Sequence, residues 1–243
     1  TSATATLVGL WQIRDHLTTH VIRGTWQTAL AENWRIGKWL TGSTLVSWVS
    51  GQLYPVLTAG FVSVAATGAI RATQTILGPT HIILKAIDSV MTPKAAGVYK
   101  QQGGGGLRSL IQRISITTGP AMACYCIAVA IFAKPLLSIL YGEPYGKYWW
   151  VLVLHTAIYA LVYLSTIVTI ALKAMERTAP TFRAYVLSAA IVLTGGWMAV
   201  AILGLPGAMI GLVLHILILN AVLWRSYVQG QRQGTLIAAN QVR

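Results

Sequence analysis

Residues 149–172 read WWVLVLHTAIYALVYLSTIVTIAL, a run of 24 residues without Asp, Glu, Lys or Arg. A helix that crosses a lipid bilayer needs roughly 20 consecutive apolar residues. Five other segments of the chain reach a similar length. We therefore predict an all-α transmembrane protein with six spans, at about residues 42–70, 72–91, 114–133, 149–172, 182–203 and 206–224.

Composition supports this prediction. Hydrophobic residues make up 55% of the 243 residues and charged residues only 9%, against roughly 25% charged in a typical soluble domain. The net charge of +13 comes from basic residues that lie in short groups between the spans. A nucleic-acid partner is not expected, because such a partner needs basic residues clustered on a folded polar surface. Cys124 and Cys126 lie inside one span, where they form neither a disulfide framework nor a metal site.

Turn chemistry separates the predicted spans. Proline and glycine disfavour continued helix, and they occur here as Pro93, Gly103–Gly106, Gly142–Pro144, Pro180 and Leu205–Gly207. The run of four glycines has no strand before it and no Lys-Ser/Thr after it, so it does not fit a phosphate-binding loop. We interpret it as a flexible cytoplasmic linker.

The positions of Lys and Arg predict the orientation of the spans. Short cytoplasmic loops are enriched in these residues. Fourteen of them lie before the first span, in alternate loops or after the last span, whereas the other loops hold only Arg71, Lys134 and Lys147. We therefore predict that both termini are cytoplasmic.

The domain organisation follows from the spans. Residues 1–13 are predicted to be the end of a preceding transmembrane helix, and residues 14–41 a cytoplasmic connector; an amphipathic helix at the membrane surface is an alternative for this region. Residues 42–228 are predicted to form a six-helix lobe and residues 229–243 a cytoplasmic tail. The chain is thus expected to be a fragment of a longer protein.

One span carries a polar stripe. Its polar residues recur at intervals of three and four, which places on one helix face Arg71, Gln74, Gly78, His81, Lys85 and Asp88. Ionisable groups at membrane depth are costly unless they face protein or water, so this face is predicted to line a cavity. Alternatively, Arg71 and Asp88 lie at the membrane surface and Asp88 pairs with Lys85. Gly78-Pro79 is expected to kink the helix.

Weaker polar patterns occur in three other spans. The first span has Gln52 and Tyr54, together with serines that either line the same cavity or bond to their own helix. The span at 149–172 carries on one face His155, Tyr159, Tyr163 and Thr166, which form a polar wall or pack as aromatic contacts. Gly207 and Gly211 form a small-xxx-small pattern that is typical of close helix contact.

Several motifs resemble those of a known family. The first group is Trp39-Leu40, Ser47-Trp48, Gly51–Pro55, Ala59-Gly60, Gly68–Ala72, Gln74 and Leu77–Pro79; the second is Lys134–Leu137, Leu140–Gly142, Tyr145 and Leu172–Thr178. Over about residues 35 to 228, the chain resembles the second half of bacterial oligosaccharide flippases, the polysaccharide-export branch of the multidrug/oligosaccharidyl-lipid/polysaccharide exporter superfamily.

This resemblance implies one six-helix lobe of a V-shaped two-lobe transporter, whose N-terminal lobe is missing from the chain. The implied function is non-enzymatic: translocation of an oligosaccharide linked to undecaprenyl pyrophosphate across the bacterial inner membrane, for lipopolysaccharide or other polysaccharide export. The expected partners are the lipid bilayer, the lipid-linked oligosaccharide and the missing lobe, with no cofactor or metal.

Candidate roles follow for the polar residues. Arg71 and Lys85 are candidate phosphate contacts. Gln52, Tyr54 and Gln74 are candidate hydrogen-bonding partners of the sugar or the diphosphate, and His81 and Asp88 are expected to line the same cavity. A cavity of this kind would replace the water around groups that cannot cross hydrocarbon unaided.

Two other function classes stay open. A membrane-embedded transferase or ligase usually needs clustered carboxylates, yet only Asp88 is near membrane depth, with Glu143 and Glu176 in opposite loops. A drug or cation antiporter of the same superfamily would favour an acidic, aromatic-rich pocket, whereas the stripe is mainly basic.

Overall fold

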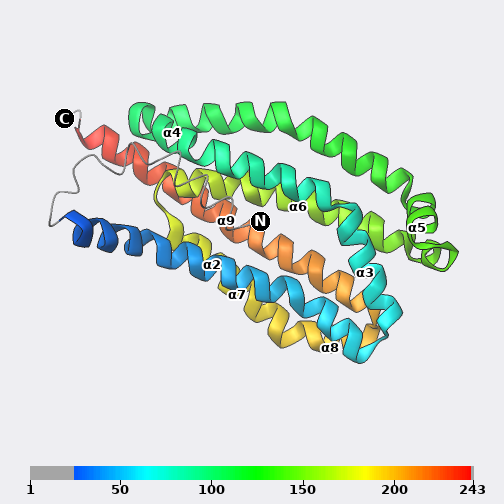
Figure 1. Cartoon of the computed structure of the whole chain (residues 1–243). Helices are drawn as coiled ribbons and strands as arrows, with labels where there is room; N and C mark the ends of the chain where they lie inside the picture. The colour runs from blue at the N-terminus through cyan, green and yellow to red at the C-terminus, as the bar shows by residue number, and fades with distance from the viewer. Residues whose placement is uncertain (1–24, 242–243) are drawn as a thin grey trace. The chain divides into compact units, whose positions relative to one another are not determined.

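The computed structural model describes residues 25–241, shown as coloured ribbon in Figure 1. The predictions for residues 1–13 and for the beginning of the connector lie outside this range. The chain divides into two compact units, Thr1–Lys38 and Trp39–Arg243. The second unit holds every predicted span.

The described residues form helices and no β-strand, as predicted for an all-α protein. In chain order they are α2 (Thr25–Phe61), α3 (Val64–Ile76), α4 (Gly78–Ile131), α5 (Ala133–Tyr141), the 3₁₀-helix η1 (Glu143–Tyr148), α6 (Trp149–Ala174), α7 (Thr178–Ile191), the π-helix η2 (Val192–Gly196), α8 (Trp197–Leu203) and α9 (Leu205–Gln241). Four stretches are long and apolar enough to cross a membrane: Gly78–Ile131, Glu143–Ala174, Thr178–Leu203 and Leu205–Gln231. The transmembrane class is therefore confirmed.

The longest of these helices contains a reversal. Figure 1 shows the α4 ribbon folding back on itself, and its non-helical residue is Gly103, with φ 65° and ψ −157°. A positive φ of this kind strains residues that carry a Cβ atom, which explains a glycine at the reversal. The rest of the glycine run is helical, so its interpretation as a flexible linker is wrong. We call Gly78–Gln102 the first arm of α4 and Gly104–Ile131 the second arm.

The turns gather at two opposite ends of the unit. A Cβ atom built on Gly204 would lie 3.8 Å from Val62, and one on Gly68 would lie 2.8 Å from the Tyr145 hydroxyl, so three turns share one end. At the other end, a Cβ atom on Gly104 would lie 2.9 Å from Gln231 Oε1, and one on Gly230 would lie 3.0 Å from Arg177. This grouping agrees with the alternation of the basic loops, while the side on which each end lies stays a prediction.

Cysteine labelling tests that side. We expect Glu143→Cys, but not Gly105→Cys, to react with a membrane-impermeant thiol reagent in intact cells. Both positions are exposed, and a Cβ atom on Gly105 meets nothing within 4 Å. Cys124 and Cys126 are replaced by serine in both variants. Labelling of Gly105→Cys in intact cells, with Glu143→Cys protected, would reverse the predicted topology.

The boundary between the first two predicted spans is wrong. The first helix ends at Phe61, not near residue 70, and α3 begins after Ser63. The Ser63 hydroxyl accepts a hydrogen bond of 3.1 Å from the backbone N–H of Ala66, which is an ordinary N-cap. Arg71 therefore does not lie in a loop: it lies seven residues into α3, about 10 Å from the start of the helix at roughly 1.5 Å per residue.

Three other boundaries differ from the predictions. The helix runs through Pro93 without ending, which membrane helices tolerate when neighbouring groups satisfy the freed backbone. Residues 25–41 of the predicted connector are helical and continue into the first span as part of α2. The predicted tail from residue 229 continues α9 as far as Gln241.

The kink predicted at Gly78-Pro79 is present as a break between two helices. Helix α3 ends at Ile76, Leu77 is a fully buried cap, and α4 begins at Gly78 with Pro79 in its first turn. Because α3 ends at Ile76 and a new helix begins at Gly78, the Ile76 carbonyl lacks the backbone N–H donor that a continuous helix would provide. The Tyr125 hydroxyl, from the second arm of α4, donates to this carbonyl at 2.8 Å.

Helix α6 forms the centre of the unit, with α3, α4 and α9 packed against it. Gly207 and Gly211 of α9 are both buried and make the predicted close contacts. A Cβ atom on Gly207 would lie 2.0 Å from the Ala199 carbonyl oxygen of α8, and one on Gly211 would lie 2.1 Å from the Tyr54 hydroxyl of α2. These glycines therefore set how closely α8 and α2 approach α9.

Candidate functional site

The structure brings three predicted site residues together. Arg71 of α3 donates from Nη2 to Gln52 Oε1 of α2 at 2.5 Å and from Nη1 to Gln74 Oε1, one turn further along α3, at 3.2 Å. We call these three residues the Arg71 cluster. The Arg71 side chain is exposed on the surface of the unit, and both glutamines are partly buried.

The cluster offers mainly hydrogen-bond donors to a ligand. Arginine cannot accept, so both glutamine amides present their oxygens to Arg71, which leaves their NH₂ groups to donate to other acceptors. Two of the five guanidinium N–H groups are engaged, and Arg71 has no carboxylate partner among the described side chains. The cluster therefore offers a positive charge and several N–H donors to an acceptor. An anion with several oxygens, such as a phosphate, matches this arrangement.

A buried contact fixes α3 against α6 beside the cluster. Thr73 is fully buried, and its hydroxyl lies 3.1 Å from His155 Nδ1 of α6. The same nitrogen lies 3.1 Å from the Val151 carbonyl. The contact limits rotation of α3, so it sets the direction in which Arg71 points. His155 is thus a packing residue, which agrees with the packing alternative for its helix face and not with a polar wall.

Two further residues of the predicted stripe lie on α4 and are exposed. The His81 ring lies 5.7 Å from the Tyr159 ring of α6, at an interplanar angle of 59°. Lys85 follows one turn later. No hydrogen bond or ion pair among the described side chains joins Lys85 to Arg71, Gln52 or Gln74, and Lys85 belongs to a separate helix, so the structure does not bring Lys85 into the Arg71 cluster.

Comparison with known proteins gives one match. Residues 2–150 match the model of the family described as "Polysaccharide biosynthesis protein", which covers more than half of the chain. The chain belongs to this polysaccharide biosynthesis protein family. No curated protein and no solved structure matches the chain. Family membership supports a role in polysaccharide biosynthesis or export for this membrane protein.

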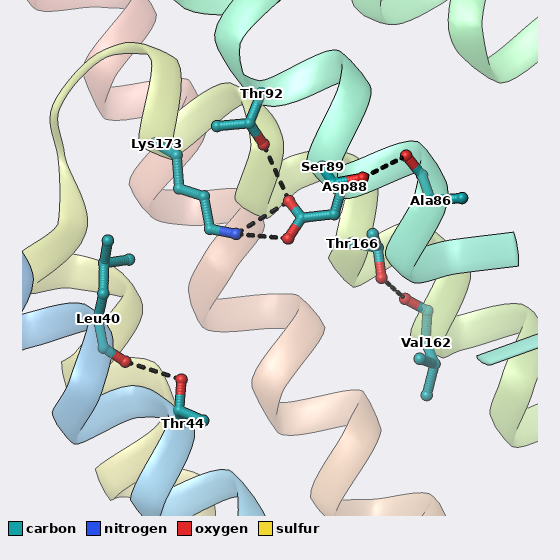
Figure 2. Close-up of polar contacts among 9 residues, drawn as sticks. All are labelled: Leu40, Thr44, Ala86, Asp88, Ser89, Thr92, Val162, Thr166 and Lys173. Atoms are coloured by element: carbon teal, nitrogen blue, oxygen red, sulfur yellow. Dashed lines mark hydrogen bonds and ion pairs between the residues drawn. The ribbon is translucent and has the colours of Figure 1, made fainter. Parts of the chain in front are cut away.

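In this polysaccharide biosynthesis protein, Asp88 pairs with a residue outside the predicted stripe. Figure 2 shows the Lys173 Nζ atom of α6 facing both carboxylate oxygens of Asp88. It donates to Oδ1 at 2.9 Å and to Oδ2 at 2.8 Å. The Thr92 hydroxyl donates to Asp88 Oδ1 at 2.9 Å. The alternative in which Asp88 pairs with Lys85 is therefore wrong. Asp88 links α4 to α6 through Lys173, and among the described side chains no hydrogen bond joins it to the Arg71 cluster.

Breaking this pair is expected to destabilise the unit. The side chains of Lys173 and Asp88 are 23% and 35% exposed. Because the pair is partly shielded from water, Asp88→Asn should lower the free energy of unfolding by roughly 2 kcal/mol. Thermal unfolding in detergent measures this loss, and the exchanged variant Asp88→Lys with Lys173→Asp should regain part of it. A melting temperature that Asp88→Asn leaves unchanged would contradict the structural role.

The structure also separates Tyr54 from the site. Tyr54 is 1% exposed, and its hydroxyl lies against Gly211 of α9, on the side of α2 away from Gln52. Tyr54 is thus a core residue in this protein and not a cavity-lining one. The serines of the same span behave likewise, because Ser43 and Ser50 donate to Trp39 and Val46 carbonyls of their own helix.

The remaining residues of the α6 face contact neighbouring helices or their own. The Tyr163 hydroxyl lies 2.9 Å from the Thr118 hydroxyl of the second arm of α4, and Thr166 donates to the Val162 carbonyl at 2.9 Å. Among the residues that the structure describes, no three His, Cys, Asp or Glu side chains gather as metal ligands. The Arg71 cluster is therefore the best candidate site in the described part of this family member.

Proposed function

We propose that this chain is the C-terminal lobe of a flippase that moves a lipid-linked oligosaccharide, of undecaprenyl-pyrophosphate type, across the bacterial inner membrane. The observation that carries the proposal is the Arg71 cluster. It places an arginine and two amides on an exposed helix surface, about 10 Å from the end of a helix in a chain built of apolar spans.

A charge that faces lipid is energetically unfavourable. A charged side chain at this depth costs several kcal/mol when it faces lipid, so arginine is retained there when it faces a polar cavity. The proposed ligand is the pyrophosphate, whose oxygens accept from the guanidinium and from the amide NH₂ groups. The hydrocarbon tail then stays in the lipid, while the cluster replaces the water lost by the headgroup.

A second lobe completes the proposed transporter. Many transporters bind substrate between two helix bundles and move it by rocking one bundle against the other. In our proposal the Arg71 cluster faces a missing N-terminal lobe. His81 and Lys85, exposed further along α4, would then contact the headgroup at a second level of the same path.

Deletion of the gene tests the proposal. We expect surface polysaccharide to be lost while the complete lipid-linked oligosaccharide accumulates on the cytoplasmic face of the inner membrane. The full-length reading frame, supplied from a plasmid, should restore export. Extraction of the lipid-linked oligosaccharide and detection of surface polysaccharide measure the two pools, and the reaction of the lipid-linked oligosaccharide with a membrane-impermeant reagent in spheroplasts assigns its face.

The same experiment separates the other two function classes. Loss of a transferase that acts on the lipid-linked sugar would yield an incomplete oligosaccharide, and loss of a ligase would leave the complete one on the periplasmic face. Loss of a drug or cation antiporter would leave both pools unchanged. Any of these three results would contradict the proposal.

A further inference from the structure

A large apolar groove lies away from the Arg71 cluster, between the second arm of α4, α6 and α9. Its volume is about 1080 Å³, slightly above the roughly 300–1,000 Å³ typical of small-molecule sites. Ile167, Val168 and Ala171 of α6 form its buried floor. The α9 wall extends from Asn220 to Gln231, about 16 Å of helix rise. This length is about half of the roughly 30 Å hydrocarbon core, the depth of one lipid leaflet.

The polarity of the groove changes along its length. Arg108 and Gln231 lie at the end nearest the Gly103 reversal, because Arg108 follows the reversal by five residues and a Cβ atom built on Gly104 would lie 2.9 Å from Gln231 Oε1. Ile116 and Leu164 line the opposite, deeper end. Two polar side chains lie near that end: Asn220 donates to the Leu161 and Ile216 carbonyls, and the Ser115 hydroxyl donates to the Ile111 carbonyl, so both are engaged by backbone.

Aromatic residues stand beside the charged end. Trp224 is 58% exposed and its ring lies 5.8 Å from that of Tyr227, whose hydroxyl accepts from Gln231 at 3.1 Å. Trp and Tyr are enriched where membrane proteins meet the lipid headgroups. The groove thus has a cationic end at headgroup level and an apolar end within the hydrocarbon.

We propose that this groove is a binding site for an anionic phospholipid. The phosphate contacts Arg108 and the acyl chain lies along the α6 floor. The charge of Arg108 is complementary to an anionic headgroup, and the depth of the groove matches one leaflet. The site lies at the end of the unit that the Lys and Arg distribution assigns to the cytoplasmic leaflet, where anionic lipids attract basic residues.

Photo-crosslinking tests the proposal. The full-length protein is placed in phosphatidylcholine nanodiscs that contain a minor fraction of phosphatidylglycerol with a photoactivatable acyl chain. We expect cross-links to map to residues 164–171 and 220–231. A phosphatidylcholine probe with the same acyl chain should label these residues about fivefold less, as one basic contact to an anionic headgroup suggests.

Three variants control for the role of Arg108. Arg108→Gln should lower phosphatidylglycerol labelling to the level of the phosphatidylcholine probe, whereas Arg108→Lys should keep most of it. Arg113→Gln, on the same arm and equally exposed but outside the groove, should leave labelling unchanged. Each variant is checked for monodisperse elution from a sizing column.

Two results would overturn the proposal. Equal labelling by both probes, unaffected by Arg108→Gln, would mean that only annular lipid is captured. Competition by undecaprenyl phosphate that is stronger than competition by unlabelled phosphatidylglycerol would assign the groove to the carrier lipid of the transport substrate. Neither result bears on whether the Arg71 cluster contacts the transported headgroup.

Discussion

Replacing Arg71 with alanine in the full-length protein is expected to abolish complementation of polysaccharide export while membrane abundance stays normal. The substitution removes the positive charge and every guanidinium donor, and it leaves the Gln52 and Gln74 oxygens without their partner. A charge-assisted hydrogen bond contributes roughly 2 kcal/mol, so loss of two such contacts to a phosphate would cost on the order of a thousandfold in binding. Surface polysaccharide per cell, with the protein quantified by immunoblot, measures the effect.

The lysine variant distinguishes binding from anchoring. Arg71→Lys keeps the charge but loses the planar fork that engages Gln52 and the phosphate together, so it should retain only part of the activity. If Arg71 merely anchored a helix at the headgroup level, lysine would serve about as well. Arg113→Ala, in a position that is also exposed, is the matched control and should export normally. Full activity of both Arg71 variants would remove the functional claim.

The second large effect is expected at Gly207. A Cβ atom there would lie 2.0 Å from the Ala199 carbonyl oxygen and 3.1 Å from Leu203 Cβ. Since the nearest atom belongs to the backbone of α8, Gly207→Ala requires α8 and α9 to move apart. We expect a loss of about 3 kcal/mol or more in the free energy of unfolding, seen as a lower melting temperature and less folded protein.

Gly51→Ala is the matched control. A Cβ atom on Gly51 meets nothing within 4 Å, so the substitution adds no contact. Alanine favours helix over glycine by about 1 kcal/mol, and Gly51→Ala should therefore leave the melting temperature unchanged or raise it. A decrease of the same size in both variants would show that packing at the α8–α9 contact is not the cause.

The sequence predicted the helical class and most of the turns, because hydropathy and the residues Gly142, Gly204 and Pro206 signal them directly. It misplaced the turn between the first two spans. That turn is formed by Val62 and Ser63, which do not interrupt the apolar run, and no proline marks it. Its only signal in the sequence is Ser63, which caps α3. This error placed Arg71 in a loop, whereas Arg71 lies within α3.

The candidate site was predictable in part. A three- and four-residue period places side chains on one face of a helix but does not say which neighbouring helix they meet. The period correctly grouped Arg71 with Gln74, and the adjacent span supplied Gln52. It could not reveal that Lys173, counted among the loop residues, is the partner of Asp88, because that contact joins residues 85 positions apart. Tyr54 was misassigned for the same reason, since its burial depends on Gly211.

Cysteine modification at position 74 tests whether the Arg71 cluster lies in a water-accessible cavity and contacts a lipid pyrophosphate. The Gln74→Cys variant of the full-length protein, with Cys124 and Cys126 replaced by serine, is treated with a water-soluble thiol reagent. The control is Ile127→Cys, which lies on the exposed apolar surface of α4. We predict that Gln74→Cys reacts, that undecaprenyl pyrophosphate slows its reaction, and that Ile127→Cys stays unmodified. If Gln74→Cys stays as unreactive as Ile127→Cys, or if undecaprenyl pyrophosphate leaves the Gln74→Cys rate unchanged, the Arg71 cluster is not a water-accessible site for the lipid pyrophosphate.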